Sequence, residues 1–499
     1  MGSRVVAPGP MRGSNGVAFG PDDRLYVAQF LSGLISAVDL AAGDVEVVVG
    51  ADSPVRSPDD LAFGPDGSMY ITDLVPGRVW RRAPDGRYTL VSDEVKLPNG
   101  IACAGDRLFV NEMRMGGRVL ELFPAGGEPV VLADGLEMGN AMQLGPDGLL
   151  YYPHMATGEV FRVSPDGGPP ELVADGVHEP VAVRFDRGGE LLVLSRGAAG
   201  IVTRISPAGR SIVETGIAGL DNAAFDEENR MFVSSFAAGG IAEVHPDGRT
   251  REVVPPGLAG PFGVTVDLGG TVFTGDHYRV TSVDGTMREM LVFSHGIAAD
   301  GPLLHVTSQY GDVRTYDPAA RTVRTRAAGL AQPMGLAVGD GMLVVAESGA
   351  GRVVAIDESD ELSVLAEGLA RPVDVAVAEG TWYASDETRG TVVRLPDAVP
   401  VASGLEAPQG IAVLGQELFV VEAGARRLTA VDVGTGETRV KVADLAVLPP
   451  SEAQLFAHGM PGLPGRFAGV AAAPDGALYV AANGEGTVVR VVPRSVRGA

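Results

Sequence analysis

Short runs of alternating apolar and polar residues follow one another along the whole chain, separated by turn residues. The segments "PDDLAFGPDGSMYITD" (58–73), "GNAMQLGPDGLLYYPH" (139–154) and "FAGVAAAPDGALYVAANG" (467–484) are variants of one unit. Alternation with a period of two predicts β-strands, and Asp-Gly between two such runs predicts a hairpin. A second pair of alternating runs, as in "GRVWRRAPDGRYTLVSDEV" (77–95), follows each time. Four short strands in about 40 residues correspond to one blade of a β-propeller.

The repeat predicts twelve such blades and therefore an all-β fold. The units begin near residues 15, 58, 98, 139, 180, 220, 261, 295, 333, 372, 408 and 467. We expect two six-bladed rings, with blades 1–6 in residues 1–260 and blades 7–12 in residues 261–499. One twelve-bladed ring is the alternative, but its central hole would be too broad for side chains to fill.

The last unit holds only three strands before the chain ends. The N-terminal segment "RVVAPG" (4–9) resembles the fourth strand of other units, such as "LVADG" (172–176). Pairing it with a later blade would cover an exposed sheet edge. It could complete either unit six or unit twelve.

Composition and charge narrow the possible partners. Hydrophobic residues make up 45% and charged residues 20%, as in an ordinary folded protein. A net charge of −24 disfavours nucleic acids and anionic membranes but is compatible with a cation. The single cysteine, Cys103, excludes an intramolecular disulfide framework and a Cys-rich zinc site. With no leader and no long apolar run, we expect a cytoplasmic protein with a small-molecule substrate; a removed signal peptide and any oligomeric state are compatible.

Polar residues recur where the innermost strand of each early blade begins. In a propeller blade, the start of the first strand and the end of the second strand meet at one mouth of the central channel. The polar starting positions in the first half are Asn15, Asp59, Asn99, Asn140 and Asp221. Carboxylate and amide oxygens are typical ligands of a hard cation, Ca²⁺ or Mg²⁺. Turn formation explains each single position as well, because Asn and Asp favour turns.

The patterns "PNGIA…LFVNE" and "PDG.LYV" resemble those of SMP-30/gluconolactonase, NHL-repeat and strictosidine-synthase-like propellers, over essentially all twelve units. These blades host lactonases, lyases, condensing enzymes and scaffolds. In the lactonase-type members a Ca²⁺-type ion is held by a Glu, by Asn residues that include one in a PNG turn, and by an Asp. The resemblance therefore implies Asn99 as a ligand, with Asn140 and Asp221 as the later amide and acid. Unit one has "SNG" in place of the Glu, and Asp59 could supply the missing charge.

The ends of the second strands supply candidate catalytic residues. His154 stands where neighbouring units place an acid, so it could act as a general base near neutral pH or simply bond to a loop. Glu112 could support the ion from outside or act as a base. Asp73 is a third candidate, although acids at this position often bond to loop backbone.

The second half presents a mostly apolar mouth, which suits a small organic ligand better than an ion. Its predicted binding residues are Phe262, His277, His295 and Gln409, with His458 in the long segment 445–466. Long loops are often functional. This one is either a lid or a packing plug.

Three functions remain open from the sequence. The first is a metal-dependent hydrolase of a lactone or similar ester. The second is a metal-independent lyase or cyclase that acts on a small natural product. The third is a non-catalytic scaffold of the NHL type.

Overall fold

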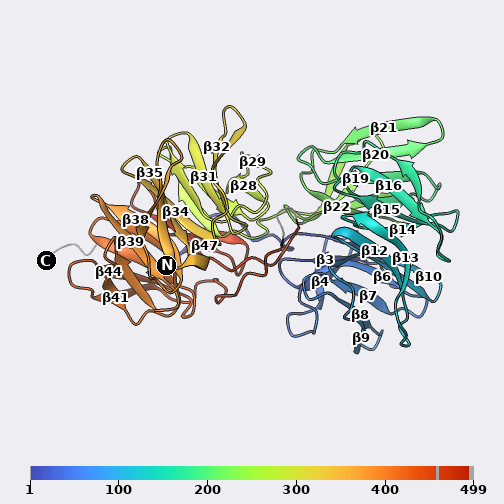
Figure 1. Ribbon diagram of the computed structural model, residues 1–499, viewed down its shortest axis with the longest axis horizontal. Helices are drawn as coiled ribbons and strands as arrows, with labels where there is room; N and C mark the ends of the chain where they lie inside the picture. Colours follow the sequence, from blue (N-terminus) through green and yellow to red (C-terminus); the bar gives the residue numbers. More distant parts are fainter. Residues whose placement is uncertain (1, 457–459, 494–499) are drawn as a thin grey trace. The chain divides into compact units, whose positions relative to one another are not determined.

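The computed structural model describes residues 2–456 and 460–493, and in this part 48 strands form twelve four-stranded antiparallel sheets. The predicted all-β propeller fold with twelve blades is confirmed. The chain divides into two compact units, Gly9–Ala259 and Gly260–Ala499 with Met1–Pro8. We refer to them as the first propeller (blue to green in Figure 1) and the second propeller (yellow to red).

Every blade of the first propeller uses four consecutive strands. In chain order the blades are β2 (Val17–Phe19), β3 (Leu25–Gln29), β4 (Leu34–Val38), β5 (Val45–Val49); β6 (Pro58–Phe63), β7 (Met69–Asp73), β8 (Arg78–Arg82), β9 (Tyr88–Ser92); β10 (Pro98–Ala104), β11 (Arg107–Glu112), β12 (Met115–Leu122), β13 (Val130–Glu137); β14 (Gln143–Leu144), β15 (Leu150–His154), β16 (Glu159–Val163), β17 (Glu171–Ala174); β18 (Pro180–Phe185), β19 (Leu191–Ser195), β20 (Ile201–Ser206), β21 (Gly209–Glu214); and β22 (Leu220–Phe225), β23 (Met231–Ser235), β24 (Ile241–Val244), β25 (Thr250–Val254).

The second propeller repeats this arrangement and adds one 3₁₀ helix, η1 (Ser348–Ala350). Its strands are β26 (Gly263–Val266), β27 (Val272–Asp276), β28 (Arg279–Ser282), β29 (Arg288–Glu289); β30 (Ile297–Asp300), β31 (Leu303–Ser308), β32 (Asp312–Asp317), β33 (Thr322–Ala327); β34 (Pro333–Gly339), β35 (Met342–Glu347), β36 (Arg352–Ile356), β37 (Leu362–Ala366); β38 (Pro372–Ala378), β39 (Thr381–Asp386), β40 (Thr391–Arg394), β41 (Val399–Ser403); β42 (Pro408–Leu414), β43 (Glu417–Glu422), β44 (Arg427–Asp432), β45 (Thr438–Val442); and β46 (Val470–Ala472), β47 (Leu478–Ala482), β48 (Thr487–Val491) with β1 (Ser3–Arg4). None of the helices in the described part of the chain has the length and apolar character of a membrane span.

The N-terminal strand completes the last blade and not the sixth. Ser3 pairs with Arg490 and Arg4 with Val489 in antiparallel register. The label N accordingly lies over the second propeller in Figure 1. Covering the outer edge of β48 in this way ties the two ends of one ring together and leaves no open edge there.

The first propeller closes without a shared strand. Between its last and first blades, the Ser14 N–H donates to the Ser235 carbonyl at 2.9 Å. The Ser234 hydroxyl donates to the Asn15 carbonyl and accepts from the Asn222 N–H at 3.1 Å. Because these groups are buried, each bond satisfies a polar atom that would otherwise be costly.

Replacing Ser234 with Ala is expected to lower the unfolding free energy of the first propeller by about 2 kcal/mol, since it leaves two buried backbone groups unpaired. Hydrogen exchange should accelerate at both β2 and β22, which close the ring. Ser385→Ala is the matched control, because Ser385 makes the same two bonds between consecutive blades, to Asp374 and Gln409. Faster exchange at β22 alone would contradict the closing role.

Hairpin turns lie at the far end of the innermost strands, and those of the second and fourth blades contain Asp-Gly. In the first of these, the Gly64 N–H donates to the Ser68 carbonyl at 2.9 Å, and Gly67 has a φ of 76°. A positive φ is easy for Gly, so the "GPDG" sequence fixes this turn. The turns therefore mark the end of the channel opposite to Asp59 and Asn99.

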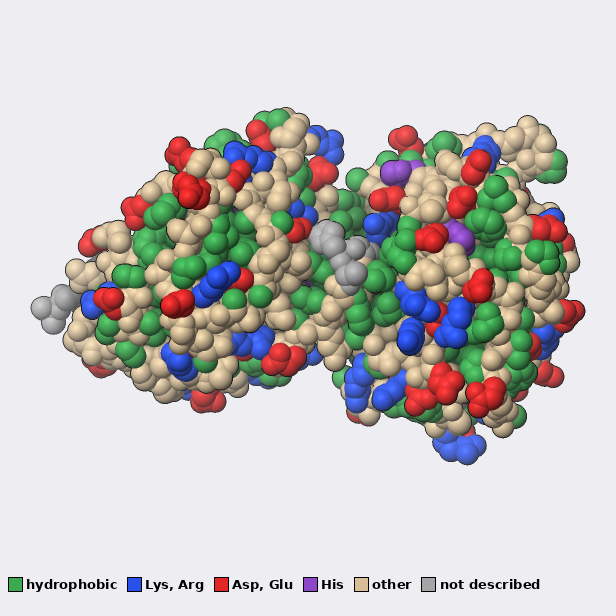
Figure 2. All heavy atoms as spheres, viewed as in Figure 1, with side chains coloured by type: hydrophobic (Ala, Val, Ile, Leu, Met, Phe, Trp, Pro, Cys, Tyr) green, Lys and Arg blue, Asp and Glu red, His purple; other side chains and the backbone are tan. Residues whose placement is uncertain are grey.

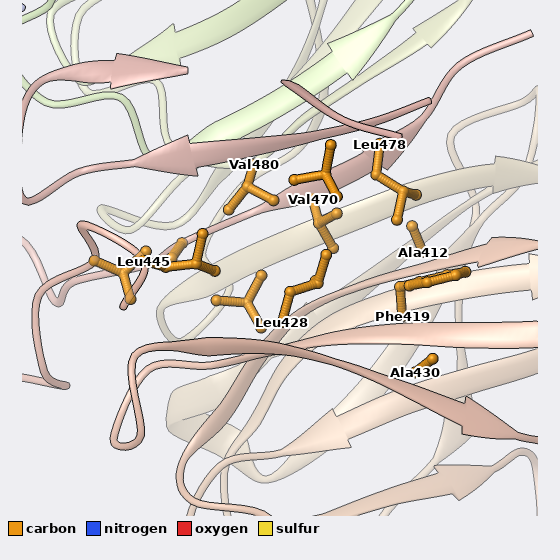
Figure 3. Packing of buried hydrophobic residues seen from close by; sticks show 12 residues of the cluster. Ala412, Phe419, Leu428, Ala430, Leu445, Val470, Leu478 and Val480 are labelled. Carbon is orange, nitrogen blue, oxygen red and sulfur yellow. The ribbon is translucent and has the colours of Figure 1, made fainter. Parts of the chain in front are cut away.

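The hydrophobic core is distributed between neighbouring blades. Figure 3 shows the cluster between the last two blades, where Phe419 and Leu428 pack against Val470, Leu478 and Val480. Similar clusters lie at other blade interfaces, and one of them, around Phe232, joins the sixth blade to the first. Burying each large apolar side chain contributes about 1.5–3 kcal/mol. The rings are thus stabilised by packing all the way round.

Acidic and basic side chains are interspersed over the surface shown in Figure 2. Many of these side chains form ion pairs between an arginine and an acidic residue of a turn. Examples are Arg81 with Asp66 at 2.6 Å and Arg490 with Asp475 at 2.7 Å. Such exposed pairs contribute only about 0–1 kcal/mol each. They explain the high arginine content better than a basic binding surface does.

Candidate functional site

A bulge at the start of two innermost strands directs neighbouring side chains into the channel of the first propeller. On β6, Pro58 pairs with Asp73 but the next pair is Leu61 with Ile71, so two residues lie in the irregular segment. The same shift occurs on β22 between Leu220 and Ala223. Because a bulge interrupts the normal alternation, consecutive residues can point to one side.

Asp59 is buried at the start of β6 and lies between two asparagines from neighbouring blades. The Asn15 Nδ2 donates to Asp59 Oδ1 at 3.2 Å, and the Asn99 Nδ2 donates to Asp59 Oδ2. Burial raises the pKa of Asp59 to about 7, the negative charge of Asp60 adds to the rise, and the two amides oppose it. The structure thus brings together three of the five predicted ligands.

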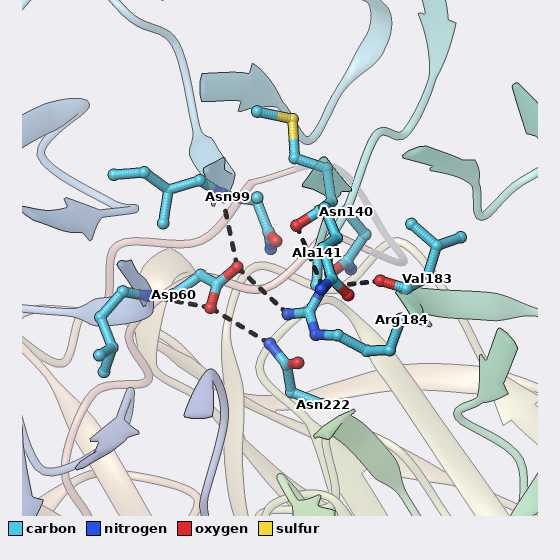
Figure 4. A network of polar contacts seen from close by, with 12 residues as sticks. Asp60, Asn99, Asn140, Ala141, Val183, Arg184 and Asn222 are labelled. Atoms are coloured by element: carbon cyan, nitrogen blue, oxygen red, sulfur yellow. Dashed lines mark hydrogen bonds and ion pairs between the residues drawn. The ribbon is translucent and has the colours of Figure 1, made fainter. Parts of the chain in front are cut away.

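Asp60 points toward Asn222 and Arg184 (Figure 4). The Asn222 Nδ2 donates to Asp60 Oδ1 at 3.2 Å, and Arg184 Nη2 lies 3.8 Å from Asp60 Oδ2. The backbone N–H groups of Leu61 and Ile101 also donate to this carboxylate. Burial raises the pKa of Asp60 to about 6, although Arg184 and these donors act against the rise.

Asp221 is the third carboxyl group of the channel and is partly exposed. Burial holds its pKa well above the usual range, the charges of Asp59 and Asp60 raise it further, and Arg184 opposes them. No hydrogen bond to its carboxyl group is present among the described residues. It is therefore the carboxyl group with the most freedom to exchange a proton or bind a ligand.

Asn140 lies at the edge of this group. Its Nδ2 is 3.6 Å from Met113 Sδ and 3.8 Å from Met155 Sδ, and its Oδ1 accepts from the Ala141 N–H at 2.7 Å. Met113 also contacts the Asn99 amide at 3.3 Å. Met113 thus lies beside the amides of both Asn99 and Asn140. We call Asp59, Asp60, Asp221, Arg184 and the amides of Asn15, Asn99, Asn140 and Asn222 the Asp59 cluster.

Carboxylates alone do not form a metal site in this structure. Within residues 2–456 and 460–493, no group of three or more His, Cys, Asp or Glu side chains could hold a metal ion. A cation at the Asp59 cluster would therefore need amide oxygens as well as carboxylates. The predicted ligand set, three amides and two acids, is of this mixed kind.

The acids at the ends of the second strands share one structural role. Each accepts a hydrogen bond from the backbone N–H of the residue sixteen positions earlier, in the loop that leads into its blade. The pairs are Asp73 with Ser57, Glu112 with Lys96, Asp276 with Gly260, Glu347 with Ala331, Asp386 with Ala370 and Glu422 with Glu406.

Two predicted catalytic residues, Asp73 and Glu112, belong to this set. Glu112 is fully buried and pairs with Arg118 at 2.6 Å and Arg114 at 3.1 Å. Burial raises its pKa, but the bonds from Arg118 and Lys96 prevail and hold the pKa below the usual value. Asp73 also accepts from the Trp80 indole at 3.2 Å. These contacts anchor loops, so we do not carry either residue forward as a base.

Replacing Glu112 with Gln is expected to lower the unfolding free energy of the first propeller by about 2 kcal/mol, because charge-assisted bonds are lost. Since the folded pKa is depressed, this contribution is present above the unfolded value of 4.5 and disappears as the pH falls through the folded pKa. Thermal unfolding of both forms across acidic pH checks it. Glu422→Gln, which removes the same contacts to Arg427 in the second propeller, is the control and should leave the first propeller unchanged.

His154 lies in the packing between blades. Its ring is 4.5 Å from that of Phe161 and 5.8 Å from that of Tyr152, and its Nδ1 lies 4.0 Å from Glu159 Oε2. Burial lowers the pKa of His154. Its Nε2 has no hydrogen-bond partner in the described part of the chain. These contacts give no path to the Asp59 cluster, and His154 is not carried forward as the base.

The channel of the second propeller is filled by an apolar cluster of Phe262, Met334, Val373 and Phe467. The predicted residue His295 stacks on Phe262 at 4.6 Å and on Phe467 at 5.5 Å. Its Nε2 lies 2.9 Å from the Gly465 carbonyl oxygen. The channel position is thus occupied by the protein's own side chains.

The remaining predicted residues of this half differ in their environments. The Gln409 amide donates to Glu387 at 2.7 Å and to the Arg466 carbonyl at 3.0 Å, and its oxygen accepts from the Ala468 N–H at 2.9 Å. His458 lies outside the described residues. The described part of the segment 445–466 bonds to the second propeller, where the Gly462 N–H donates to the Tyr310 hydroxyl at 2.7 Å.

His277 is buried with a φ of 46°, and its imidazole lies close to three aromatic rings. Its imidazole centroid lies 4.6 Å from Tyr278, 5.7 Å from Phe293 and 5.8 Å from Phe262. Neither ring nitrogen has a hydrogen-bond partner in the described chain. Burial lowers the pKa of His277 to about 3, and the nearby His295 adds to this effect.

The sequence reasoning missed Asp60, Asn222 and Arg184. The first two follow predicted residues directly, and the bulges described above bring them into the channel. A signal was available, because "PDDLAF" and "PVAVRF" place a charged residue inside an otherwise apolar innermost strand. A buried charge of this kind needs a partner, and here the two partners are Asp60 and Arg184.

Comparisons with known proteins find similar folds only. No family model matches the chain, and no curated relative matches it. Similar solved structures include a streptogramin B lyase (16% identity, 55% of this chain and 94% of that chain, TM-score 0.41). A regucalcin from Agrobacterium tumefaciens, described as calcium-binding, is 19% identical over 47% of this chain and 86% of its own (TM-score 0.39). A nidogen/laminin complex is 20% identical over 44% and 88% (TM-score 0.40). These structures include names from the propeller group that the sequence resembles.

Proposed function

We propose that the first propeller is a divalent-cation-dependent hydrolase that opens a lactone or similar ester at the Asp59 cluster. The supporting observation is the charge of the channel. Three carboxyl groups, Asp59, Asp60 and Asp221, share a desolvated space with one guanidinium group, that of Arg184. When all three are ionised, two negative charges remain uncompensated, and a divalent cation would neutralise them.

The donor atoms suit a hard cation. Asp59 would hold the ion together with the amide oxygens of Asn15, Asn99 and Asn140, and oxygen ligands of this kind favour Ca²⁺ or Mg²⁺ over softer metals. Met113 beside two of these amides is a poor ligand for such ions and marks one edge of the site. A bound cation would polarise the ester carbonyl and stabilise the charge that develops on its oxygen.

Asp221 is the residue that we assign as general base. It is partly exposed and, within the described chain, keeps its carboxyl group free of hydrogen bonds, so it can accept a proton from the attacking water. A raised pKa makes it a stronger base than an ordinary aspartate. Asp60 is held by Asn222 and Arg184 and keeps the negative charge next to Asp59 in place.

Calorimetric titration of chelator-treated protein with Ca²⁺ and with Mg²⁺ tests the proposal. We expect one cation per first propeller and release of protons near neutral pH, because Asp59 must ionise to bind it. Buffers that differ in ionisation enthalpy measure the released protons. Asp221→Asn should keep cation binding within about tenfold but lose lactone turnover by about 100-fold or more. The surface variant Asp85→Asn is the control and should change neither.

Two outcomes would overturn the proposal. Turnover of a natural-product substrate that persists in chelator would favour the cation-independent lyase or cyclase. Absence of cation binding and of turnover, with a protein partner that co-purifies, would favour the scaffold.

A further inference from the structure

A cavity opens at the end of the first propeller's channel opposite to Asp59 and Asn99. It has a volume of about 640 Å³ and is lined by the later residues of all six innermost strands. It extends to the Asp-Gly turns, where Pro146, Arg187 and Gly189 are exposed at its rim. A volume of this size is within the range of small-molecule sites.

Four phenylalanines form a collar in the wall of this cavity, which also contains polar groups. Phe19, Phe63, Phe185 and Phe225 line it, and all four are only partly buried. Phe63 and Phe185 also make edge contacts with Tyr26 and Tyr151. Aromatic rings that remain half exposed around a cavity of this size would gain free energy by covering an apolar ligand.

Arg184 is a buried cationic group of the cavity, which Gln143, Asp186 and Arg187 also line. Its Nε donates to the Ala223 carbonyl at 2.9 Å, and its Nη1 donates to the carbonyls of Val183 and Met142 at 2.8 and 3.1 Å. Its Nη2 makes no hydrogen bond to the described residues and has only the 3.8 Å ion pair with Asp60. This nitrogen therefore keeps N–H groups for an acceptor, and the fixed carbonyl contacts hold it in place.

The second propeller lacks this combination. Its corresponding cavity is about 230 Å³, and the charged side chain that lines it is the carboxyl group of Asp374 instead of an arginine. Both propellers share the same blade plan, so a large cavity with a cationic donor is not a general consequence of the fold. It is specific to the first propeller.

We propose that this cavity binds an apolar ligand with one oxygen acceptor, a carbonyl or a carboxylate, placed on Arg184. The apolar body would lie against the phenylalanine collar, and the oxygen would accept from Nη2. Asp60 already balances the charge of Arg184, so the head group requires an acceptor oxygen and no positive charge. The site shares Arg184 with the Asp59 cluster, but Asp59, Asp60 and Asp221 do not line it, and it does not require the proposed hydrolase activity.

Cys103 allows a direct test, because the only cysteine of the chain lines this cavity. Burial raises the pKa of its thiol to about 12, so labelling with a methanethiosulfonate reagent should be slow and easily followed. Octanoate and 2-octanone are the two acceptor probes, and octylammonium is the probe that lacks an acceptor. We expect the acceptor probes to slow labelling of the full-length protein at about tenfold lower concentration than octylammonium. Stronger protection by octanoate than by 2-octanone would indicate a charged head group, and stronger protection by 2-octanone would indicate a neutral one.

Two variants locate the ligand within the cavity. Arg184→Met should weaken the acceptor probes about 10- to 100-fold, as expected for a bond to a charged donor. Phe225→Gln keeps Arg184 and changes one ring of the collar, and it should weaken both acceptor probes about tenfold. This second variant keeps the test valid if Arg184→Met does not fold. Phe123→Gln, outside the cavity, is the matched control and should have no effect.

Three results would overturn the inference. Labelling of Cys103 in the folded protein could be unaffected by both acceptor probes at millimolar concentrations. Octylammonium could protect as well as octanoate and 2-octanone. The acceptor probes could bind the folded Arg184→Met and Phe225→Gln variants as they bind the unchanged protein.

Discussion

Replacing Asp59 with Asn is expected to remove cation binding and, in the absence of cations, to stabilise the first propeller at alkaline pH. The reason is the cost of ionising a buried carboxyl group. The folded pKa is about 7 against a usual value of 3.8, so the folded state binds the proton more tightly than the unfolded state does. Stability therefore falls as the pH rises from the unfolded to the folded value and stays low above it.

The size of the effect follows from the pKa difference. At 1.36 kcal/mol for each pKa unit, the ionised Asp59 costs on the order of 4 kcal/mol above about pH 7. The Asn variant avoids this cost, so its advantage should be largest near pH 8 and shrink toward pH 4. Chemical unfolding in chelator at several pH values measures it.

Added cation should make the unchanged protein more stable than Asp59→Asn, which reverses their order of stability. A ligand that binds only the folded state stabilises it by RT ln(1 + c/Kd), where c is the free ligand concentration. Ca²⁺ or Mg²⁺ should therefore raise the melting temperature of the unchanged protein at pH 8 but leave Asp59→Asn unaffected. The exposed variant Asp85→Asn is the control and should follow the unchanged protein. Equal stabilisation of all three proteins by cation would show that Asp59 is not a ligand.

The blades could be predicted from the sequence because their signals are local. Asp-Gly turns such as that at Gly67 and the alternation beside them specify each hairpin without reference to the rest of the chain. The closure of the rings could not be predicted in the same way. The choice of β48 as partner of the N-terminal strand depends on contacts between residues more than 480 positions apart.

The candidate site was predictable only in part, for a geometric reason. Asp59 and Asn99 come together as the repeat implies, because both occupy the start of an innermost strand. Asp60 and Asn222 were missed because alternation places neighbours of channel residues on the other face, and only a bulge brings them back. The register shift that causes a bulge depends on the pairing partner, which the alternation does not specify.

The acids at the ends of the second strands show how position alone can suggest a catalytic role. Position alone made Glu112 and Asp73 resemble catalytic residues, since both lie toward the mouth. Their chemistry is determined by the loop sixteen residues earlier, whose N–H groups they accept. The same bond recurs at Glu422 in the second propeller, whose described residues form no matching cluster of channel carboxylates. A feature present in both rings is better explained by the blade than by a reaction.

Replacing His277 with Asn is expected to remove a large part of the acid sensitivity of the second propeller. The folded pKa of about 3 lies far below the usual value of 6.5, because burial keeps the imidazole neutral. The unfolded chain takes up the proton below pH 6.5, so this contribution to stability is present at neutral pH and is lost as the pH falls toward the folded pKa. At 1.36 kcal/mol for each unit, the loss reaches about 3 kcal/mol near pH 4.5.

Asparagine is the suitable replacement because it tolerates the positive φ of 46° at this position. It also loses ring contacts with Tyr278 and Phe293, but that loss is the same at every pH. The measured quantity is therefore the change in protection between about pH 7 and pH 4.5, from hydrogen exchange of the amides in β27 and β28. His245→Asn, in a hairpin turn of the first propeller, is the matched control. If His277→Asn and the unchanged protein lose equal protection on acidification, the buried imidazole is not the source of the acid sensitivity.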